Sequence, residues 1–289
     1  MASWRFFERR KPLAPDFSIT AIISVYDDEV YLSRCFKNME DCGVEAIVVD
    51  NDCLPGTREI VEANVGGVVR EVVRHPREGT FDWSGILRHK EEIANSRNSD
   101  WMMLWDTDEF RQAPDGADDF RTAIRAADEA GYTTVNFDEF VFVPVTESEE
   151  HRGTDYVAGL ETYYYFAPRP QHRANAWRKP GGNVALMKGA GHTVAFGGQR
   201  VSPDHFAMRH FLFLSHAHGM QKYLGRSYSD EDQTKGWSSE RRNTTVETFR
   251  LPDPTTMKRK SAGVAWDRSD RRAQHPTFIY TAMDGIEGT

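Results

Sequence analysis

Two aspartates separated by a single residue follow a strongly apolar segment in the stretch WMMLWDTDEF, residues 101–110. Residues i and i+2 of an extended chain project from the same face, which would bring Asp106 and Asp108 together and turn Thr107 away. Carboxylates this close repel each other, and their hard oxygens suit Mg²⁺ or Mn²⁺, which leave coordination positions open for substrate phosphates. The stretch therefore predicts a divalent cation beside a phosphorylated ligand. The alternative is that the acids cap the next helix or form salt bridges.

Strands and helices alternate through the first half of the chain. Apolar runs predict strands at 17–26, 44–50, 68–74, 101–106 and 132–145, and helical spacing predicts helices at 29–43, 56–67, 84–100 and about 117–130. This alternation predicts an α/β fold with a mostly parallel sheet covered by helices on both faces. Ligands of such sheets bind beyond the carboxyl ends of the strands. Three of those ends carry acids, at Asp27–Asp28, Asp50–Asp52 and Asp106–Asp108, so one sheet edge is expected to form a site.

The pattern changes after about residue 150, where aromatic and basic residues are interrupted by proline and glycine. Loops and short strands are expected there, followed by a buried strand at 206–216 and a helix at 217–228. From residue 229 the sequence is polar, which predicts a surface extension to the C-terminus. The expected domains are therefore a main domain at 17–228 and a C-terminal extension of mixed loops, strand and helix at 229–289.

Composition restricts the class of protein. The 289 residues carry a net charge of −8, with 39% hydrophobic residues, which suits a folded core and argues against a generic nucleic-acid or membrane-surface protein. The charge is uneven, because residues 169–272 hold 19 lysines and arginines against nine acids. Three cysteines without a CxxC pair argue against a disulfide framework or a zinc site. No transmembrane segment or signal peptide is evident, so a cytoplasmic location is expected.

The segment ISVYDDEVYLSRCFKNMEDCGVEAIVVDNDCLPGTREIV, residues 23–61, resembles the opening of family-2-type glycosyltransferases with the GT-A fold. The family's conserved elements correspond here to Asp28–Glu29, Asp50–Asn51 and Gly56–Thr57. LWDTDEF is similar to the family's DxD motif with the Glu-Phe that often follows it. The resemblance covers roughly residues 17–145. One departure is Pro55, where the family often has an aspartate, and Asp52 is the candidate to replace it.

The resemblance implies transfer of a sugar from a nucleotide diphosphate donor to a glycan or small-molecule acceptor, with Mn²⁺ or Mg²⁺ bridging the two phosphates. Residues 17–145 would then be the nucleotide- and metal-binding half, and residues 146–228 the acceptor-side half. The implied metal ligands are Asp106, Asp108 and His210, with Asp108 the direct ligand of first choice. The implied nucleotide contacts are Tyr26, Glu29, Asp50, Asp52, Asp106 and Lys222, with Asp50 at the base or ribose.

The stretch RHFLFLSHAHGMQKYLGR, residues 209–226, supplies the candidates from the second half of the chain. By resemblance to related transferases, His210 would be the third metal ligand, and Lys222 or Arg226 would steady the diphosphate. Alternation also places His210 on one face of a strand with two leucines, so an ordinary core histidine is the alternative. His192, flanked by flexible glycines, is the second candidate for a ligand or acceptor contact.

An inverting transferase needs a carboxylate near the acceptor hydroxyl to remove its proton. The stretch NFDEF, residues 136–140, offers Asp138 and Glu139 just past the fifth predicted strand, and alternation allows only one of them to face the cleft. The alternative for both is a hydrated turn between strands. Asp155 and Glu161 are remoter candidates.

The leading prediction is a metal-dependent, inverting glycosyltransferase. A nucleotidyltransferase is a second class, but it usually has a glycine-rich, basic loop after the first strand, where this chain has the acidic SVYDDEVY. A metal-dependent hydrolase built on His205, His210, His216 and His218 is a third, although these residues lack a compact HxH or HExxH pattern. A non-catalytic sugar- or nucleotide-binding protein with a degenerate transferase fold is the fourth.

Overall fold

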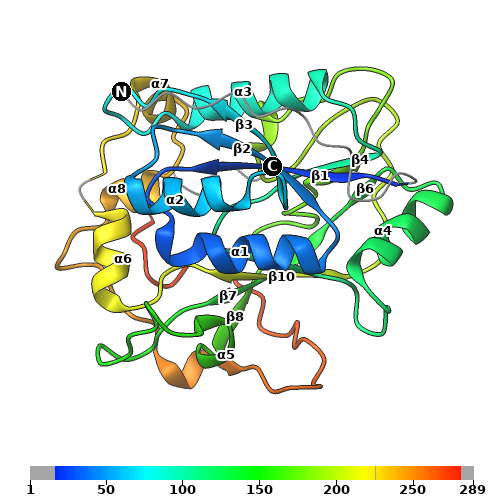
Figure 1. Ribbon diagram of the computed structural model, residues 1–289. Helices are drawn as coiled ribbons and strands as arrows, with labels where there is room; N and C mark the ends of the chain where they lie inside the picture. The colour runs from blue at the N-terminus through cyan, green and yellow to red at the C-terminus, as the bar shows by residue number, and fades with distance from the viewer. Residues whose placement is uncertain (1–16, 225, 281–289) are drawn as a thin grey trace.

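A six-stranded sheet in the order β3-β2-β1-β4-β9-β6 forms one layer of the molecule (Figure 1). The computed structural model describes residues 17–224 and 226–280. Strands β1 to β4 pair in parallel, and β9, from the second half of the chain, pairs antiparallel with β4 and β6. The strands are β1 (Ile19–Val25), β2 (Glu45–Asp50), β3 (Val69–Arg74), β4 (Trp101–Leu104), β6 (Thr134–Val135) and β9 (Ala176–Arg178).

Helices cover both faces of this sheet, which confirms the predicted α/β class with a mostly parallel sheet. Alternate residues of β1 divide between the faces: Ala21 and Ile23 pack with the helices α1 and α4, whereas Ile22 packs with α3. In Figure 1 α1, α2 and α4 accordingly lie below the sheet and α3 above it. The helices are α1 (Glu29–Asp41), α2 (Pro55–Asn64), α3 (Trp83–Ser96) and α4 (Phe120–Glu129).

A second sheet, in the order β11-β8-β7-β10-β5, lies on the other side of α1 (Figure 1). Its strands are β5 (Glu109–Gln112), β7 (Phe137–Phe142), β8 (Thr162–Phe166), β10 (Phe206–Phe211) and β11 (Lys258–Arg259). Only β7 and β10 pair in parallel. The segment 132–145, expected as a strand whose second part could be separate, is indeed divided, because the chain leaves the first sheet after Val135 and enters the second at Phe137.

The remaining helices lie in the second half of the chain: α5 (Tyr156–Gly159), η1 (Met187–Gly189), α6 (His216–Tyr223), α7 (Asp230–Thr234), α8 (Ser239–Asn243) and η2 (Pro254–Thr256). The expectation that the chain beyond 228 lies on the surface is wrong in part. Asp232 of α7 is buried and accepts hydrogen bonds from the backbone N–H groups of Trp83 and Ser84 at 2.7 and 2.9 Å. Within the described ranges, no helix is long and apolar enough to cross a membrane.

Asp232 is expected to contribute strongly to stability, because it satisfies donors at the start of α3 that would otherwise have no partner. Its carboxylate also accepts from the Ser84 hydroxyl at 2.6 Å. Asp232→Ala should lower the free energy of unfolding by about 2 kcal/mol, the upper range for a lost helix cap. Urea unfolding measures this change, and Asp230→Ala, an exposed position on the same helix, is the matched control. Equal effects of the two substitutions would contradict the prediction.

Candidate active site

A cavity of about 1900 Å³ opens beyond the carboxyl ends of β1 and β4. It exceeds the roughly 300–1,000 Å³ of most single-ligand pockets. The first half of the chain lines it with Tyr26, Asp27, Asp28 and Asn51 after the first two strands, and with Asp106, Thr107 and Asp108 after β4. The second half adds His192, His210, Lys222 and much of α8. The structure therefore brings the predicted sheet edge and the candidates from the second half to one place.

The DTD stretch is a turn rather than an extended chain. Thr107 and Asp108 lie in a turn that leads into β5, and Thr107 lines the cavity with both aspartates instead of pointing away. The Thr107 hydroxyl donates to Asp28 Oδ1 at 2.6 Å, and Asp28 Oδ2 accepts from the Tyr26 N–H at 2.7 Å. Asp28 thus fixes the end of β1 to the turn after β4.

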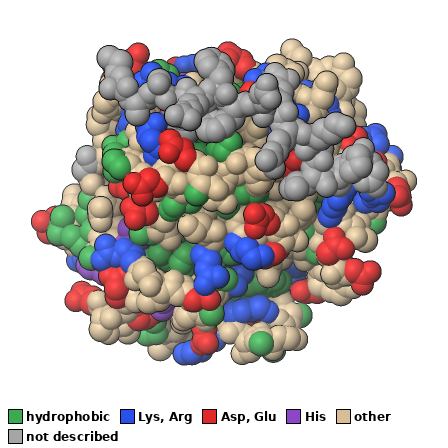
Figure 2. All heavy atoms as spheres, in the orientation of Figure 1, with side chains coloured by type: hydrophobic (Ala, Val, Ile, Leu, Met, Phe, Trp, Pro, Cys, Tyr) green, Lys and Arg blue, Asp and Glu red, His purple; other side chains and the backbone are tan. Residues whose placement is uncertain are grey.

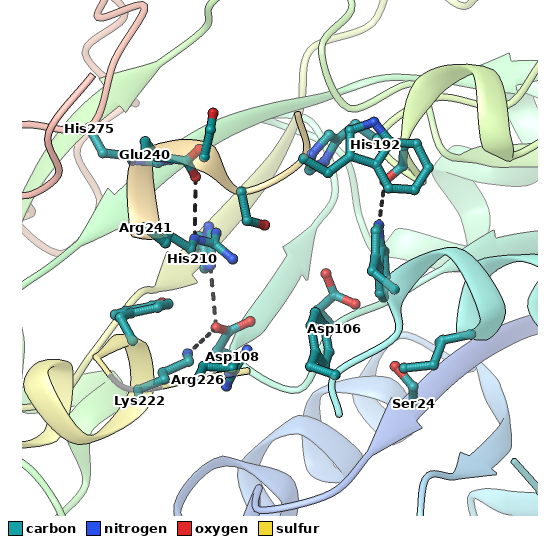
Figure 3. Close-up of a pocket in the computed structure, with 18 of the residues that line it drawn as sticks. Ser24, Asp106, Asp108, His192, His210, Lys222, Arg226, Glu240, Arg241 and His275 are labelled. Carbon is teal, nitrogen blue, oxygen red and sulfur yellow. Dashed lines mark hydrogen bonds and ion pairs between the residues drawn. The ribbon is translucent and has the colours of Figure 1, made fainter. Parts of the chain in front are cut away.

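Asp108 is paired with two cations from the second half of the chain (Figure 3). Lys222 Nζ lies 2.6 Å and His210 Nε2 3.4 Å from Asp108 Oδ2. Burial disfavours the charged carboxylate, but Lys222 and His210 outweigh it and hold the pKa of Asp108 well below its usual range. Ser215 caps α6 through the backbone N–H of His218, which fixes the helix that carries Lys222.

His210 stands between two carboxylates. Its Nδ1 lies 2.6 Å from Glu139 Oε1, and Arg173 binds the same carboxylate through Nε and Nη2 at 2.7 and 3.1 Å. Burial disfavours the imidazolium, but Asp108 and Glu139 together raise the pKa of His210 to about 10. His210 is thus a buried histidine with a carboxylate at each ring nitrogen, and it also lines the cavity.

Asp106 has a cation of its own. Its carboxylate is about half exposed, and Lys90 Nζ, which is fully buried in α3, lies 3.7 Å away. Burial lowers the pKa of Lys90, whose ammonium also faces the Trp83 ring at 5.1 Å. The sequence argument that the two aspartates require a metal to offset their repulsion is therefore incomplete, because lysines and a histidine from the chain already do so.

The arrangement of Asp108 and His210 nevertheless fits a divalent cation. A metal-binding imidazole typically donates its second nitrogen to a carboxylate, as His210 does to Glu139. Its other nitrogen faces Asp108 across the 3.4 Å gap. No group of three or more histidine, cysteine or acidic side chains able to hold a metal occurs in the described part of the chain. The donor set therefore suits an ion such as Mg²⁺ or Mn²⁺ that takes its remaining ligands from phosphate and water.

Tyr26 and Arg77 form the wall next to the ends of β1 and β2. The guanidinium carbon of Arg77 lies 3.8 Å from the centroid of the Tyr26 ring, and Arg77 Nη1 donates to Asn51 Oδ1 at 3.2 Å. Asp52, expected at the nucleotide, does not line the cavity. Instead it accepts from the Arg77 backbone N–H at 2.9 Å and pairs with Arg74. Arg77 was not identified from the sequence.

Asp50 and Glu29, also expected at the nucleotide, are likewise absent from the cavity wall. Asp50 is 1% exposed, and its carboxylate turns back to accept from the Cys53 N–H at 2.7 Å. Glu29 is exposed at the start of α1 and lies against Gly56, where an added Cβ would come 2.1 Å from its Oε2. Both side chains therefore contact loop residues next to the cavity and do not line it.

Asp138 and Glu139 lie inside β7, not just past a strand, and neither lines the cavity. Alternation along β7 turns them to opposite sides, as predicted. Asp138 accepts from Arg268 at 2.6 Å and faces His205 at 2.9 Å, whereas Glu139 supports His210. Both predicted bases are therefore held by basic partners away from the cavity wall.

The other histidines do not form one centre. Of the four histidines considered for a hydrolase, His210 and His218 line the cavity, whereas His205 faces Asp138 outside the wall and His216 packs on Phe249. The geometry predicted for a hydrolase on these four residues is therefore not present. His192 does line the cavity, and its Nδ1 lies 2.5 Å from Arg173 Nη1. Burial and Arg173 hold the pKa of His192 well below its usual value.

Comparisons with known proteins give structural similarity at low sequence identity. No family model matches the chain, and no curated protein matches it. A crystal structure of S. aureus TarS is similar over 68% of this chain and 37% of that one, with 12% identity and a TM-score of 0.42. The 1–349 form of TarS in complex with UDP is similar over 80% of this chain and 73% of that one, with 12% identity and a TM-score of 0.39.

A third structure is that of glucosyl-3-phosphoglycerate synthase from Mycobacterium tuberculosis in complex with Mn²⁺, UDP and phosphoglyceric acid. The similarity covers 43% of this chain and 44% of that chain, with 14% identity and a TM-score of 0.28. The chain spans little more than a third of the first TarS structure. At these scores the similarity leaves the function to be inferred from the site itself.

Proposed function

We propose that this protein is a metal-dependent glycosyltransferase that moves a sugar from a nucleotide diphosphate donor to a hydroxyl acceptor. The observation that carries the proposal is that the side chains of Asp108, His210 and Lys222 contact one another at the carboxyl end of β4. One carboxylate and one oriented imidazole suit a cation with open positions, and the lysine adds positive charge beside them. This combination suits a diphosphate, whose charge grows as it leaves the sugar.

Each part of the wall has a role in this proposal. Tyr26, Asn51 and Arg77 offer a flat ring, an amide and a guanidinium to the nucleoside. Lys222 stabilises the negative charge of the diphosphate, and Glu139 keeps the His210 ring oriented. Asp108 and His210 would hold the Mn²⁺ or Mg²⁺, which supplies Lewis-acid stabilisation of the leaving group when bound. Inversion at the sugar carbon stays a prediction from the sequence.

Nucleotide binding tests the proposal directly. Calorimetric titration of UDP and of GDP into the protein with Mn²⁺ is expected to show binding of one nucleotide. EDTA should weaken it at least about tenfold, because loss of a residue that only supports a metal ligand already costs about that much. Excess Mn²⁺ added back is the control and should restore the affinity. Nucleotide binding that EDTA does not weaken would contradict the role proposed for the metal. If neither nucleotide bound in either condition, the sugar-donor proposal would fail.

A further inference from the structure

The cavity is positively charged although the whole chain is acidic. Its wall contains ten lysines and arginines against five aspartates and glutamates, whereas the chain has a net charge of −8. On the outer face shown in Figure 2, by contrast, acidic and basic side chains are interspersed. The excess of basic residues in the second half of the sequence therefore contributes strongly to the inside of the site.

Some of these cations are neutralised by neighbouring acids. Arg152, Arg173 and Lys235 pair with Glu150, Glu139 and Glu231, and Lys222 pairs with Asp108. Among the residues that the structure describes, four lining cations show no carboxylate within ion-pair distance: Arg77, Lys188, Arg226 and Arg242. Unpaired cations that line one cavity form a field that attracts anions.

The unpaired cations do not all lie on the nucleotide side. Arg77 and Arg226 both lie over the Phe81 ring, at 5.8 and 4.9 Å, next to Tyr26. Lys188 belongs to η1, which packs on α3 and shares a loop with His192. Figure 3 shows His192 on the opposite side of the cavity from Lys222 and Arg226.

The wall around His192 contains a second cation and a row of flat rings. The rings of His172 and His192 are 5.0 Å apart, and Phe166 is 5.3 Å from His172. Arg169 lines the same wall and lies close enough to lower the pKa of both histidines. Because burial and Arg173 lower the pKa of His172 to about 3, the rings are neutral and the positive charge here comes from arginine and lysine.

We propose that Arg169 and Lys188 bind an anionic group, such as a phosphate or a carboxylate, on the acceptor. This inference rests on the proposed function, in which the donor diphosphate occupies Lys222 and the Asp108–His210 pair on the other side. The cavity volume of about 1900 Å³ leaves room for a second substrate beside the donor. The neighbouring rings of Phe166, His172 and His192 offer flat faces to the body of a sugar or polyol.

The test uses protein saturated with Mn²⁺ and with whichever of UDP and GDP binds, so that the diphosphate position is already filled. Glucose 6-phosphate, glucuronate and glucose are titrated separately by calorimetry; they differ in the charged group on a similar body. At least one of the two anions is expected to bind about tenfold more tightly than glucose, as for a charge-assisted contact. Binding of the phosphate alone or of the carboxylate alone would support the inference and name the group.

The substitution Lys188→Gln tests whether the anion binds at this part of the cavity wall. Lys188 is exposed, so its substitution should leave the fold intact, and we expect it to weaken anion binding about fivefold, the upper range for one exposed ion pair. Affinity for the nucleotide should not change. Lys37→Gln, an exposed lysine of α1 outside the cavity wall, is the matched control. Equal affinity for glucose and both anions, or unchanged anion binding in Lys188→Gln, would overturn the inference, while Mn²⁺-dependent nucleotide binding would still support the proposed function. Failure of both UDP and GDP to bind with Mn²⁺ would overturn both.

Discussion

Replacing Asp108 with asparagine is expected to weaken Mn²⁺-dependent nucleotide binding by on the order of 100-fold. Loss of a residue that only supports a metal ligand typically costs 10- to 100-fold in affinity, so loss of the ligand charge should reach the upper end. Asparagine keeps the shape of the side chain but not its charge. Calorimetry with the nucleotide that binds the wild-type protein, with and without EDTA, measures the effect.

Asp106→Asn is the matched control for this substitution. Both residues line the cavity, but Asp106 is about half exposed and lies 3.7 Å from Lys90, whereas Asp108 is buried against Lys222 and His210. The Asp106 substitution should therefore weaken binding less. Thermal unfolding of both variants separates loss of binding from loss of fold, because Asp108→Asn also removes a carboxylate from the buried His210 and the partly buried Lys222. If a folded Asp108→Asn variant bound the nucleotide with wild-type affinity in the presence of Mn²⁺, Asp108 would have no role in metal binding.

Hydrophobic periodicity is sufficient to predict the sheet edge at which the site forms. Parallel strands end on the same side, so the sequence alone places Asp28, Asp106 and Asp108 together. Tyr26, His210 and Lys222 also reach the cavity, as the sequence resemblance implied. The three aspartates are accessible to sequence reasoning because each lies within a few positions of a strand end that the apolar pattern marks. His210 and Lys222 lie on a strand and a helix that were predicted, but the strand ends at Phe211, not at 216.

The remaining site residues depend on contacts between distant segments. Asp50 lies at a strand end as predicted, yet its carboxylate binds the backbone of its own loop, which alternation does not reveal. Lys90 is a cation on an otherwise apolar helix face, a signal that is present in the sequence but did not enter the prediction. The polar segment beyond 228 was expected at the surface, because a polar cavity wall and a solvated surface have the same composition. Glu240 on α8 is one lining residue missed for this reason.

Glu139 and Asp138 are neighbours on β7, but their side chains point to opposite sides and we expect different effects when each is replaced. Glu139→Gln should lower the free energy of unfolding by about 3 kcal/mol, because it removes one partner from a buried pair with Arg173. It should also weaken Mn²⁺ binding by about 10- to 100-fold, because the His210 ring loses its orienting carboxylate. Asp138→Asn, on the opposite side of β7, is the control and should leave Mn²⁺ affinity unchanged. Urea unfolding and Mn²⁺ titration by calorimetry measure the two effects.

The same pair of variants separates a positioning role from a catalytic one. A general base acts on the acceptor proton, so its loss would lower kcat while stability and Mn²⁺ affinity stayed at the wild-type level. Glu139 does not line the cavity and is 1% exposed, and both oxygens of its carboxylate are occupied by Arg173 and His210. A carboxylate held in this way cannot accept a proton from a substrate without first giving up its partners. We therefore expect stability and metal affinity to fall together in Glu139→Gln, and a selective loss of kcat would restore the carboxylate as the base.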